Sequence, residues 1–177
     1  MTDYKVSQKI IHALMALCIC LDLFIANKFG HEMASLDRLE SRGDHSSMGI
    51  IITVLLIIRL AMRLSYGAPP LPAGMTPVQV TAAKLAHGFM YFAMLGLVTT
   101  GVITGLNATD PIIVFKSAEL SIGNLDEGQF QFVRQFHDFF TNAMLTLIVV
   151  HIAAAMYHSF VLKDDSTRRM LKFWTSK

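Results

Sequence analysis

Charged residues are scarce in this sequence. Only 16% of its 177 residues are Asp, Glu, Lys or Arg, and 53% are hydrophobic, whereas a soluble domain carries about a quarter charged residues. The deficit indicates a membrane protein, and the length is that of one domain, residues 1–177. The formal net charge of +2 is too small to favour nucleic acid as a partner, and we expect none.

Cysteine is also scarce. Cys18 and Cys20 both lie in an apolar run, and a helix would turn their side chains about 200° apart, so they cannot easily form a disulfide or share a metal. We expect two small buried residues. No Cys-x-x-Cys-His sequence occurs, which excludes covalent attachment of a c-type heme.

Proline is absent from four apolar blocks, residues 10–26, 48–62, 85–106 and 139–162. A helix of about 20 residues crosses the hydrocarbon core, and without proline each block can be a regular helix, as lipid requires. No small-residue cleavage site follows the first block at the usual spacing, so we expect that helix to be retained. The blocks predict an all-α integral membrane four-helix bundle, with helices at roughly 8–27, 45–64, 84–106 and 135–162.

The basic residues are distributed unevenly between the two ends of these helices. The N-terminus, the second connection with its flanks and the C-terminus hold ten of the fifteen Lys and Arg residues, and the opposite side holds five. The positive-inside rule therefore predicts that both termini are cytoplasmic. Ten of the thirteen acidic residues fall on the opposite side, so we expect an acidic outer face.

Histidine is unusually frequent in the apolar blocks. His31 lies in the first outer loop, where we expect it to be solvated. The other six histidines lie in or at the ends of the blocks: His12, His45, His87, His137, His151 and His158. An ionisable side chain in lipid is costly and is a candidate for function. One such histidine would equally suit an interhelical hydrogen bond, but six together favour a functional site.

Two histidines of the fourth block, His137 and His151, are fourteen residues apart. On a helix they are separated by about 21 Å along the axis and lie within about 40° of the same face. Since coordination bonds are about 2 Å long, one metal cannot use both. The spacing predicts two separate centres, one near each side of the membrane.

Each centre needs a second ligand from another helix. On the outer side, His45 begins the second helix near the level of His137, and we pair these two. Gly49, one turn later, would leave room for a flat macrocycle.

On the inner side, His12 and His87 are both candidates to pair with His151. Each follows a lysine by three residues, so their depths are indistinguishable and the spacing does not choose between them. His158 lies one heptad beyond His151, at the expected cytoplasmic border, and we expect an interfacial or structural role for it.

The donor set favours heme over zinc. Zinc sites usually need three or four ligands at one level, whereas only pairs of imidazoles are available at each depth. A porphyrin needs only axial ligands from the protein, and its apolar ring replaces side-chain packing. Arg59 and Arg63, one turn apart at the inner end of the second helix, could neutralise heme propionates or simply anchor the helix at the membrane edge.

The sequence resembles the bacterial cytochrome b561 family, which is related to the b-type subunits of nickel hydrogenases and formate dehydrogenases. The resemblance covers nearly the whole chain in the expected order, and its most specific element is the His-x13-His spacing of the fourth helix. The sequence departs from the family at Ala13, directly after His12, where family members often have tryptophan. The segments that carry it are 7–17 (SQKIIHALMAL), 45–49 (HSSMG), 58–66 (IRLAMRLSY), 85–91 (LAHGFMY) and 136–163 (FHDFF…HIAAAMYHSFVLK).

The resemblance implies two heme b groups per chain, each with two histidine ligands. By this resemblance, His12 and His151 ligate the cytoplasmic-side heme, and His45 and His137 ligate the periplasmic-side heme. His87 matches a family position that is not an axial ligand, and it would lie near the inner heme or a quinone.

The expected function is electron transfer across the bilayer, between a quinone or quinol and a periplasmic-side redox partner. Iron with two histidine ligands has no open position, so the hemes should carry electrons and not bind oxygen. The outer connection at 107–135 is long for a link and is the candidate docking site. We expect a multi-pass protein of the bacterial inner membrane, in contact with lipid.

Three other functions are compatible with the pattern. Some relatives of the family oxidise superoxide at the periplasmic face and reduce ubiquinone, which would favour a positive field around the outer heme, with Lys116 or Arg134 as local sources. The chain could also be a heme-bearing membrane anchor subunit of a larger oxidoreductase. A heme-free metal or ion transporter would use the histidines as a path, but four helices without an internal repeat argue against it.

Overall fold

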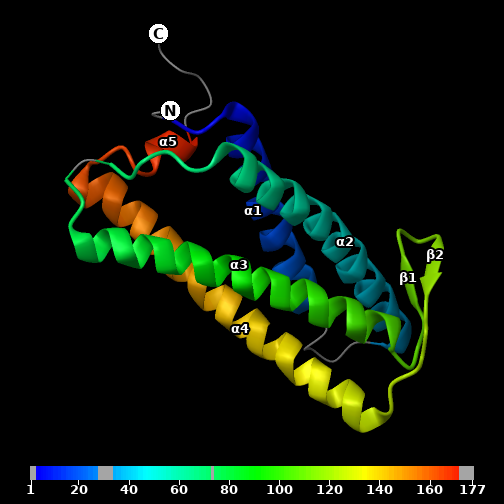
Figure 1. Ribbon diagram of the computed structural model, residues 1–177. Helices are drawn as coiled ribbons and strands as arrows, with labels where there is room; N and C mark the ends of the chain where they lie inside the picture. The colour runs from blue at the N-terminus through cyan, green and yellow to red at the C-terminus, as the bar shows by residue number, and fades with distance from the viewer. Residues whose placement is uncertain (1–2, 28–33, 73, 172–177) are drawn as a thin grey trace.

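A computed structural model describes residues 3–27, 34–72 and 74–171, and within these ranges the chain is almost entirely helical (Figure 1). The four long helices are α1 (Val6–Asn27), α2 (Ser35–Tyr66), α3 (Pro77–Leu106) and α4 (Glu127–Tyr157). A π-helical turn, η2 (His158–Leu162), extends α4, and the short α5 (Arg168–Leu171) follows. Two strands, β1 (Ile112–Val114) and β2 (Ala118–Leu120), pair antiparallel between α3 and α4. The prediction of an all-α protein is confirmed.

Four helical segments are long and apolar enough to cross a membrane. They are Val6–Ala26, Leu36–Tyr66, Pro77–Leu106 and Glu127–Leu162. Few of their residues are buried inside the protein, as expected for helices whose outer faces meet lipid rather than water. Cys20 illustrates this: it is exposed and Cys18 is only half-buried, so the expectation of two buried cysteines is wrong, because lipid takes the place of protein around the outward face of α1.

Local sequence signals explain where the helices begin and end. Thr76 caps α3 and Asp126 caps α4, and in each case a glutamine three residues later completes a capping box. Pro77 occupies the first turn of α3, where its missing N–H costs nothing. Gly67, with φ of 69°, ends α2.

Three helices begin well before the starts that the apolar blocks predict. α2 begins at Ser35, α3 at Pro77 and α4 at Glu127, whereas the apolar pattern predicts starts near 45, 84 and 135. The added turns mix polar with apolar residues, and most of their described side chains are exposed. Hydropathy therefore gives no sign of them, although water accepts a polar helix as readily as a loop.

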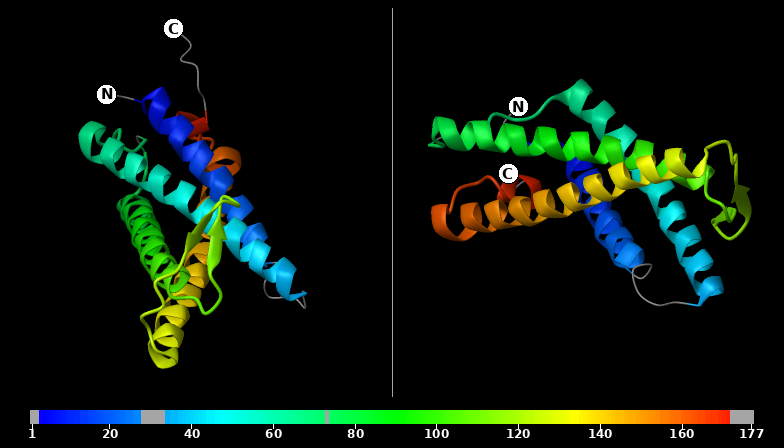
Figure 2. Two further views of the ribbon diagram at one scale, coloured as in Figure 1. Left: turned by 90° about the vertical axis from the view of Figure 1, so that its right-hand side faces the viewer. Right: turned by 90° about the horizontal axis from the view of Figure 1, so that it is seen from below.

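The helices form two antiparallel pairs. α1 packs mainly on α2 and α3 mainly on α4, whereas contacts between the two pairs are fewer. Figure 2 shows the pairs crossing at an angle. The beginning of α1 and the short α5 lie at one end of the bundle, and the β1–β2 hairpin lies at the other (Figure 1).

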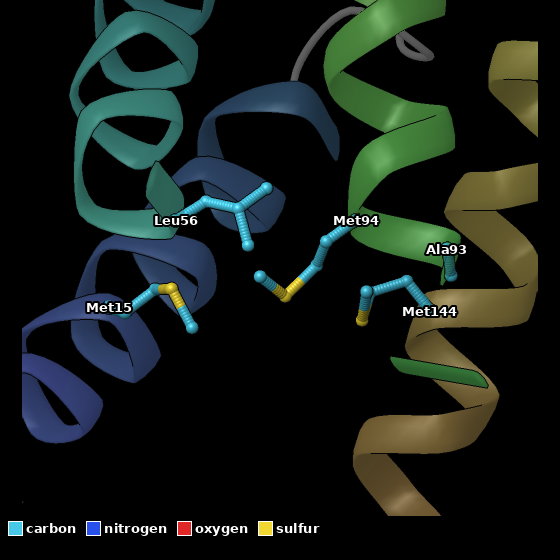
Figure 3. Packing of buried hydrophobic residues seen from close by; sticks show 5 residues of the cluster. All are labelled: Met15, Leu56, Ala93, Met94 and Met144. Carbon is cyan, nitrogen blue, oxygen red and sulfur yellow. The ribbon is translucent and has the colours of Figure 1, made fainter. Parts of the chain in front are cut away.

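The protein core is small and lies halfway along the bundle. Its buried members come from all four helices: Met15, Leu56, Ala93, Met94 and Met144 (Figure 3). Leu56 and Met144 are only 2% and 1% exposed. Along α4, Met144 lies midway between the two histidines at 137 and 151, so this core lies between the levels of the two expected centres.

Hydroxyl groups inside the helices are satisfied by their own backbone. The side chains of Thr53, Thr100 and Thr146, for example, each donate a hydrogen bond to the carbonyl oxygen four residues earlier. Such bonds let a polar side chain enter the membrane without an unpaired donor. No buried side-chain nitrogen or oxygen lacks a partner in the part of the chain that the structure describes.

The outer connection between α3 and α4 is shorter and more ordered than the apolar pattern suggests. It runs over residues 107–126, because α4 begins at Glu127. Asn107 organises it: the side-chain oxygen accepts from the backbone N–H groups of Asn124 and Leu125. The hairpin rests on α2, where the backbone of Ile113 lies against Gly43 and leaves no space for a side chain there.

The α3–α4 contact yields a stability prediction at Gly96. A Cβ atom at this position would come within 2.5 Å of the Phe140 ring. We expect Gly96→Ala to lower the melting temperature in detergent, because overpacking costs about 1–3 kcal/mol and exceeds the gain of about 1 kcal/mol in helix propensity. Gly88→Ala is the control, since its Cβ would meet nothing within 4 Å. A Gly96→Ala protein that melts no lower than Gly88→Ala would contradict the proposed packing.

Candidate heme-ligand site

The outer pair of histidines lies between α2 and α4. The ring centroids of His45 and His137 are 6.2 Å apart, and the rings are nearly perpendicular, at 80°. Two imidazoles on opposite sides of one metal have centroids about 6.3 Å apart, from two bonds of about 2.0 Å and the ring radii. The two rings are therefore spaced as the axial ligands of one metal would be.

The His137 ring is held by α3. Its Nδ1 lies 3.0 Å from the Thr100 hydroxyl oxygen, and that hydroxyl donates its own proton to the Gly96 carbonyl at 2.7 Å. The hydroxyl must therefore accept from the imidazole N–H, which leaves Nε2 of His137 free to bind a metal. Gly101 allows this approach, since a Cβ there would lie only 3.2 Å from the His137 ring.

The His45 ring is held by α1. Its Nδ1 lies 2.8 Å from a carboxylate oxygen of Asp22. A metal-binding histidine commonly donates its other ring N–H to a carboxylate, a carbonyl or a similar group, which fixes the ring and its tautomer. The two outer imidazoles are therefore oriented by partners on two different helices.

Three imidazoles meet at the inner level. The ring centroids of His12 and His151 are 6.3 Å apart, and those of His87 and His151 are 5.4 Å apart. The first distance matches two axial ligands of one metal, and the second is short of it by nearly 1 Å. His87 is exposed, and its Nδ1 donates to the Ala83 carbonyl of its own helix at 2.6 Å.

Two arginines near the end of α2, Arg59 and Arg63, differ in their surroundings. Arg59 is half-buried, and its guanidinium lies 6.0 Å from the centre of the Tyr91 ring. Its positive charge acts on both His12 and His151. Arg63, one turn later, is exposed. The structure thus brings Arg59, but not Arg63, to the inner histidines.

His158 lies apart from these pairs. The Nδ1 of His158 is 2.5 Å from an Asp164 carboxylate oxygen, and the Thr167 hydroxyl donates to the Ala155 carbonyl beside it. Burial alone would raise the pKa of Asp164, but hydrogen bonds from His158 and Ser166 hold that pKa below its ordinary value. His158 therefore fastens the chain after α4, in line with the expected structural role. His31 falls outside the described residues.

The donor set fits heme better than a bare metal ion. Among the described residues, no group of three or more His, Cys, Asp or Glu side chains could hold a metal ion, and a pair of facing imidazoles matches the two axial ligands that a porphyrin takes from a protein. Gly49, one turn after His45, has open space where a Cβ would be. Both features suit a porphyrin with two axial histidines.

Two residues that orient the candidate ligands, Thr100 and Asp22, are not indicated by the spacing of the histidines. Thr100 carries no signal in a single sequence, since threonine is common in membrane helices. Asp22 does carry one, because it is the only acidic residue of the first apolar block, and a carboxylate in lipid calls for a partner.

The family model described as prokaryotic cytochrome b561 matches residues 3–173. Cytochrome b561 homolog 2 of Escherichia coli (strain K12) is 30% identical over 129 residues, which cover 72% of this chain and 68% of that protein.

Two further relatives match over a similar length. A protein of Yersinia pestis named probable superoxide oxidase CybB is 28% identical, over 72% of each chain. Cytochrome b561 homolog 1 of Escherichia coli (strain K12) is 24% identical, over 73% of this chain and 74% of that protein. This chain therefore belongs to the prokaryotic cytochrome b561 family, the multi-pass membrane proteins that carry b-type heme and transfer electrons.

Proposed function

We propose that this protein holds two heme b groups at two membrane depths and passes electrons between a bilayer quinone or quinol and a redox partner on the periplasmic side. The observation that carries the proposal is the pair of imidazole spacings, 6.2 Å for His45–His137 and 6.3 Å for His12–His151. Both pairs share α4, which links the two depths through one rigid element.

The ligand assignment follows from these spacings. His45 and His137 hold the outer heme, and His12 and His151 hold the inner one. His12 is preferred to His87 because its ring spacing to His151 fits two axial bonds, whereas that of His87 does not. Arg59 is the propionate partner best placed at the inner heme, and Arg63, being exposed, is the weaker candidate.

The residues of the chain confine the chemistry to electron transfer. Heme b supplies a one-electron couple when bound. With His45 and His137 as the ligands of one heme and His12 and His151 as those of the other, neither iron would have an open coordination position, and oxygen would not bind to it. Thr100 and Asp22 fix the rings, and the core around Met144 excludes water from the region between the two levels.

The inner end of the bundle is the proposed site of exchange with a quinone. His87 is exposed beside His151, and Arg59 lies near the same rings. A guanidinium can donate hydrogen bonds to quinone oxygens, and the Nε2 of His87, whose Nδ1 donates to Ala83, can accept one from a quinol hydroxyl. With both chain termini cytoplasmic, as the basic residues indicate, this end lies on the cytoplasmic side of the bacterial inner membrane.

Superoxide oxidation is the second candidate, favoured by the name of the Yersinia pestis relative. The ion pairs of the outer face do not favour superoxide oxidation. Lys116 lies 2.8 Å from Glu40, and Arg134 lies 3.2 Å from Asp138. The hydrogen bond and charge of Glu40 raise the pKa of Lys116 above its usual value, so the lysine stays charged but paired, which weakens its pull on an anion. Reduction of the purified protein by a superoxide source, abolished by superoxide dismutase, would establish this activity.

The heme count tests the proposal. We expect about two b hemes per chain by pyridine hemochrome in detergent. His137→Ala and His151→Ala should each lose mainly one, because each removes one axial ligand, and so should His12→Ala. His87→Ala and His158→Ala are the controls and should keep both.

Three other results would contradict the proposal or part of it. No heme in the wild type would overturn the proposal and revive the transporter. Loss of a heme in His87→Ala but not in His12→Ala would reverse the inner ligand assignment. Constant co-purification of a larger enzyme, with no electron transfer by the chain alone, would identify an anchor subunit.

Thr100 should support heme binding through His137. We expect Thr100→Val to weaken retention of the outer heme by about 10–100-fold, as is typical when a group that orients a metal ligand is removed, and Thr100→Ser to behave as wild type. Thr104→Val is the matched control, because the Thr104 hydroxyl also bonds the backbone of α3, donating to the Thr100 carbonyl. Equal heme loss from the two valine variants in a heme-transfer assay to apomyoglobin would refute the role of Thr100.

A further inference from the structure

Asp22 is a carboxylate placed inside the first membrane-spanning helix. It belongs to the segment Val6–Ala26, and its side chain is only 15% exposed. A carboxylate in such surroundings is costly unless a partner compensates for the lost hydration. The partner is His45, whose side chain is 28% exposed and whose Nδ1 lies 2.8 Å away.

The direction of this hydrogen bond follows from the chemistry of the two groups. An ionised carboxylate can only accept, so Nδ1 of His45 carries the proton and donates it to Asp22. The Nε2 atom is then the metal ligand. The bond is charge-assisted, and such bonds are roughly twice as strong as neutral ones.

No other histidine in a proposed axial pair has an equivalent partner. His137 donates to the neutral hydroxyl of Thr100. His12 and His151 form no ring hydrogen bond within the residues that the structure describes, and the nearby charge of Arg59 is positive. The outer centre therefore has a negative group bonded to a ligand, whereas the inner centre has a positive group close by.

We propose that Asp22 is a positioning residue that orients His45 and lowers the reduction potential of the outer heme below that of the inner heme. The inference rests on the two-heme function proposed above. A carboxylate that accepts the N–H of an axial imidazole makes that ligand a stronger electron donor, which stabilises ferric iron. The charge of Arg59 stabilises the reduced inner centre, which carries one positive charge less.

This asymmetry gives the electron path a direction. An electron that enters at the outer heme passes to a centre of higher potential on the inner side. The chain is then built to take electrons from the outer partner and deliver them to the quinone, and reduction of an outer acceptor by quinol would run uphill between the two hemes.

A redox titration of purified protein tests the proposal. The wild type should titrate in two steps, and His151→Ala, which keeps the outer heme, should retain the lower step. Asp22→Asn keeps the shape of the side chain but removes the charge. We expect it to raise the reduced-to-oxidised ratio of the outer heme about tenfold at fixed potential, a shift of about 59 mV, and to leave the inner step unchanged.

Two variants separate the hydrogen bond from charge and from packing. Asp44→Asn removes a carboxylate adjacent to His45 in the chain but exposed to solvent, and it should move the lower step much less. Asp22→Glu restores the charge and should return the lower step towards the wild-type value. The low-spin ferric EPR signal of the outer heme should change in Asp22→Asn and stay unchanged in Asp44→Asn.

Several results would overturn the proposal while leaving two hemes per chain in place. For Asp22→Asn, these are an unchanged lower step or a shift confined to the higher step. An equal shift of the lower step in Asp44→Asn would also overturn it. So would a His151→Ala protein that retains the higher step instead of the lower one. Loss of the outer heme from Asp22→Asn supports a positioning role if Asp22→Glu recovers it, and marks Asp22 as a packing residue if it does not. A wild type without two hemes would instead refute the function on which the inference rests.

Discussion

The arrangement of this protein depends on two imidazoles of one helix, each facing an imidazole of the other helix pair. His137 and His151 lie on α4, and they face His45 on α2 and His12 on α1. Direct packing between the two helix pairs is limited to a small core. The proposed metal bonds would thus join halves that side-chain packing alone holds weakly, and we expect heme binding and assembly of the bundle to be closely coupled.

The two centres differ in their surroundings although their ligands are alike. At the outer level, polar groups on α1 and α3 reach the ligand rings. At the inner level, the rings are accompanied by a third imidazole and an arginine. In the proposed assignment, one pattern of ligands would provide an outer centre with fixed rings and an inner centre open to exchange with a molecule from the bilayer.

The sequence predicts the fold well because lipid imposes simple rules: the length, polarity and lack of proline of the four apolar blocks are enough to define four helices. It predicts the His45–His137 pairing because both residues lie near the same end of their helices. It could not choose between His12 and His87, since both are at one depth and only helix rotation separates their ring distances. The ordered segment before α4 and the early start of that helix involve Asn107 and the Asp126 cap, which hydropathy ignores.

Electron transfer across the bilayer is tested most directly with the protein in proteoliposomes. Ferricyanide trapped inside the vesicles is supplied with a membrane-impermeant reductant outside, and its absorbance is followed. The two-centre path predicts bleaching much faster than in protein-free vesicles, and a return to that background when His151 is replaced by alanine. Bleaching no faster than in protein-free vesicles, from protein with both hemes bound, would contradict a continuous path across the membrane.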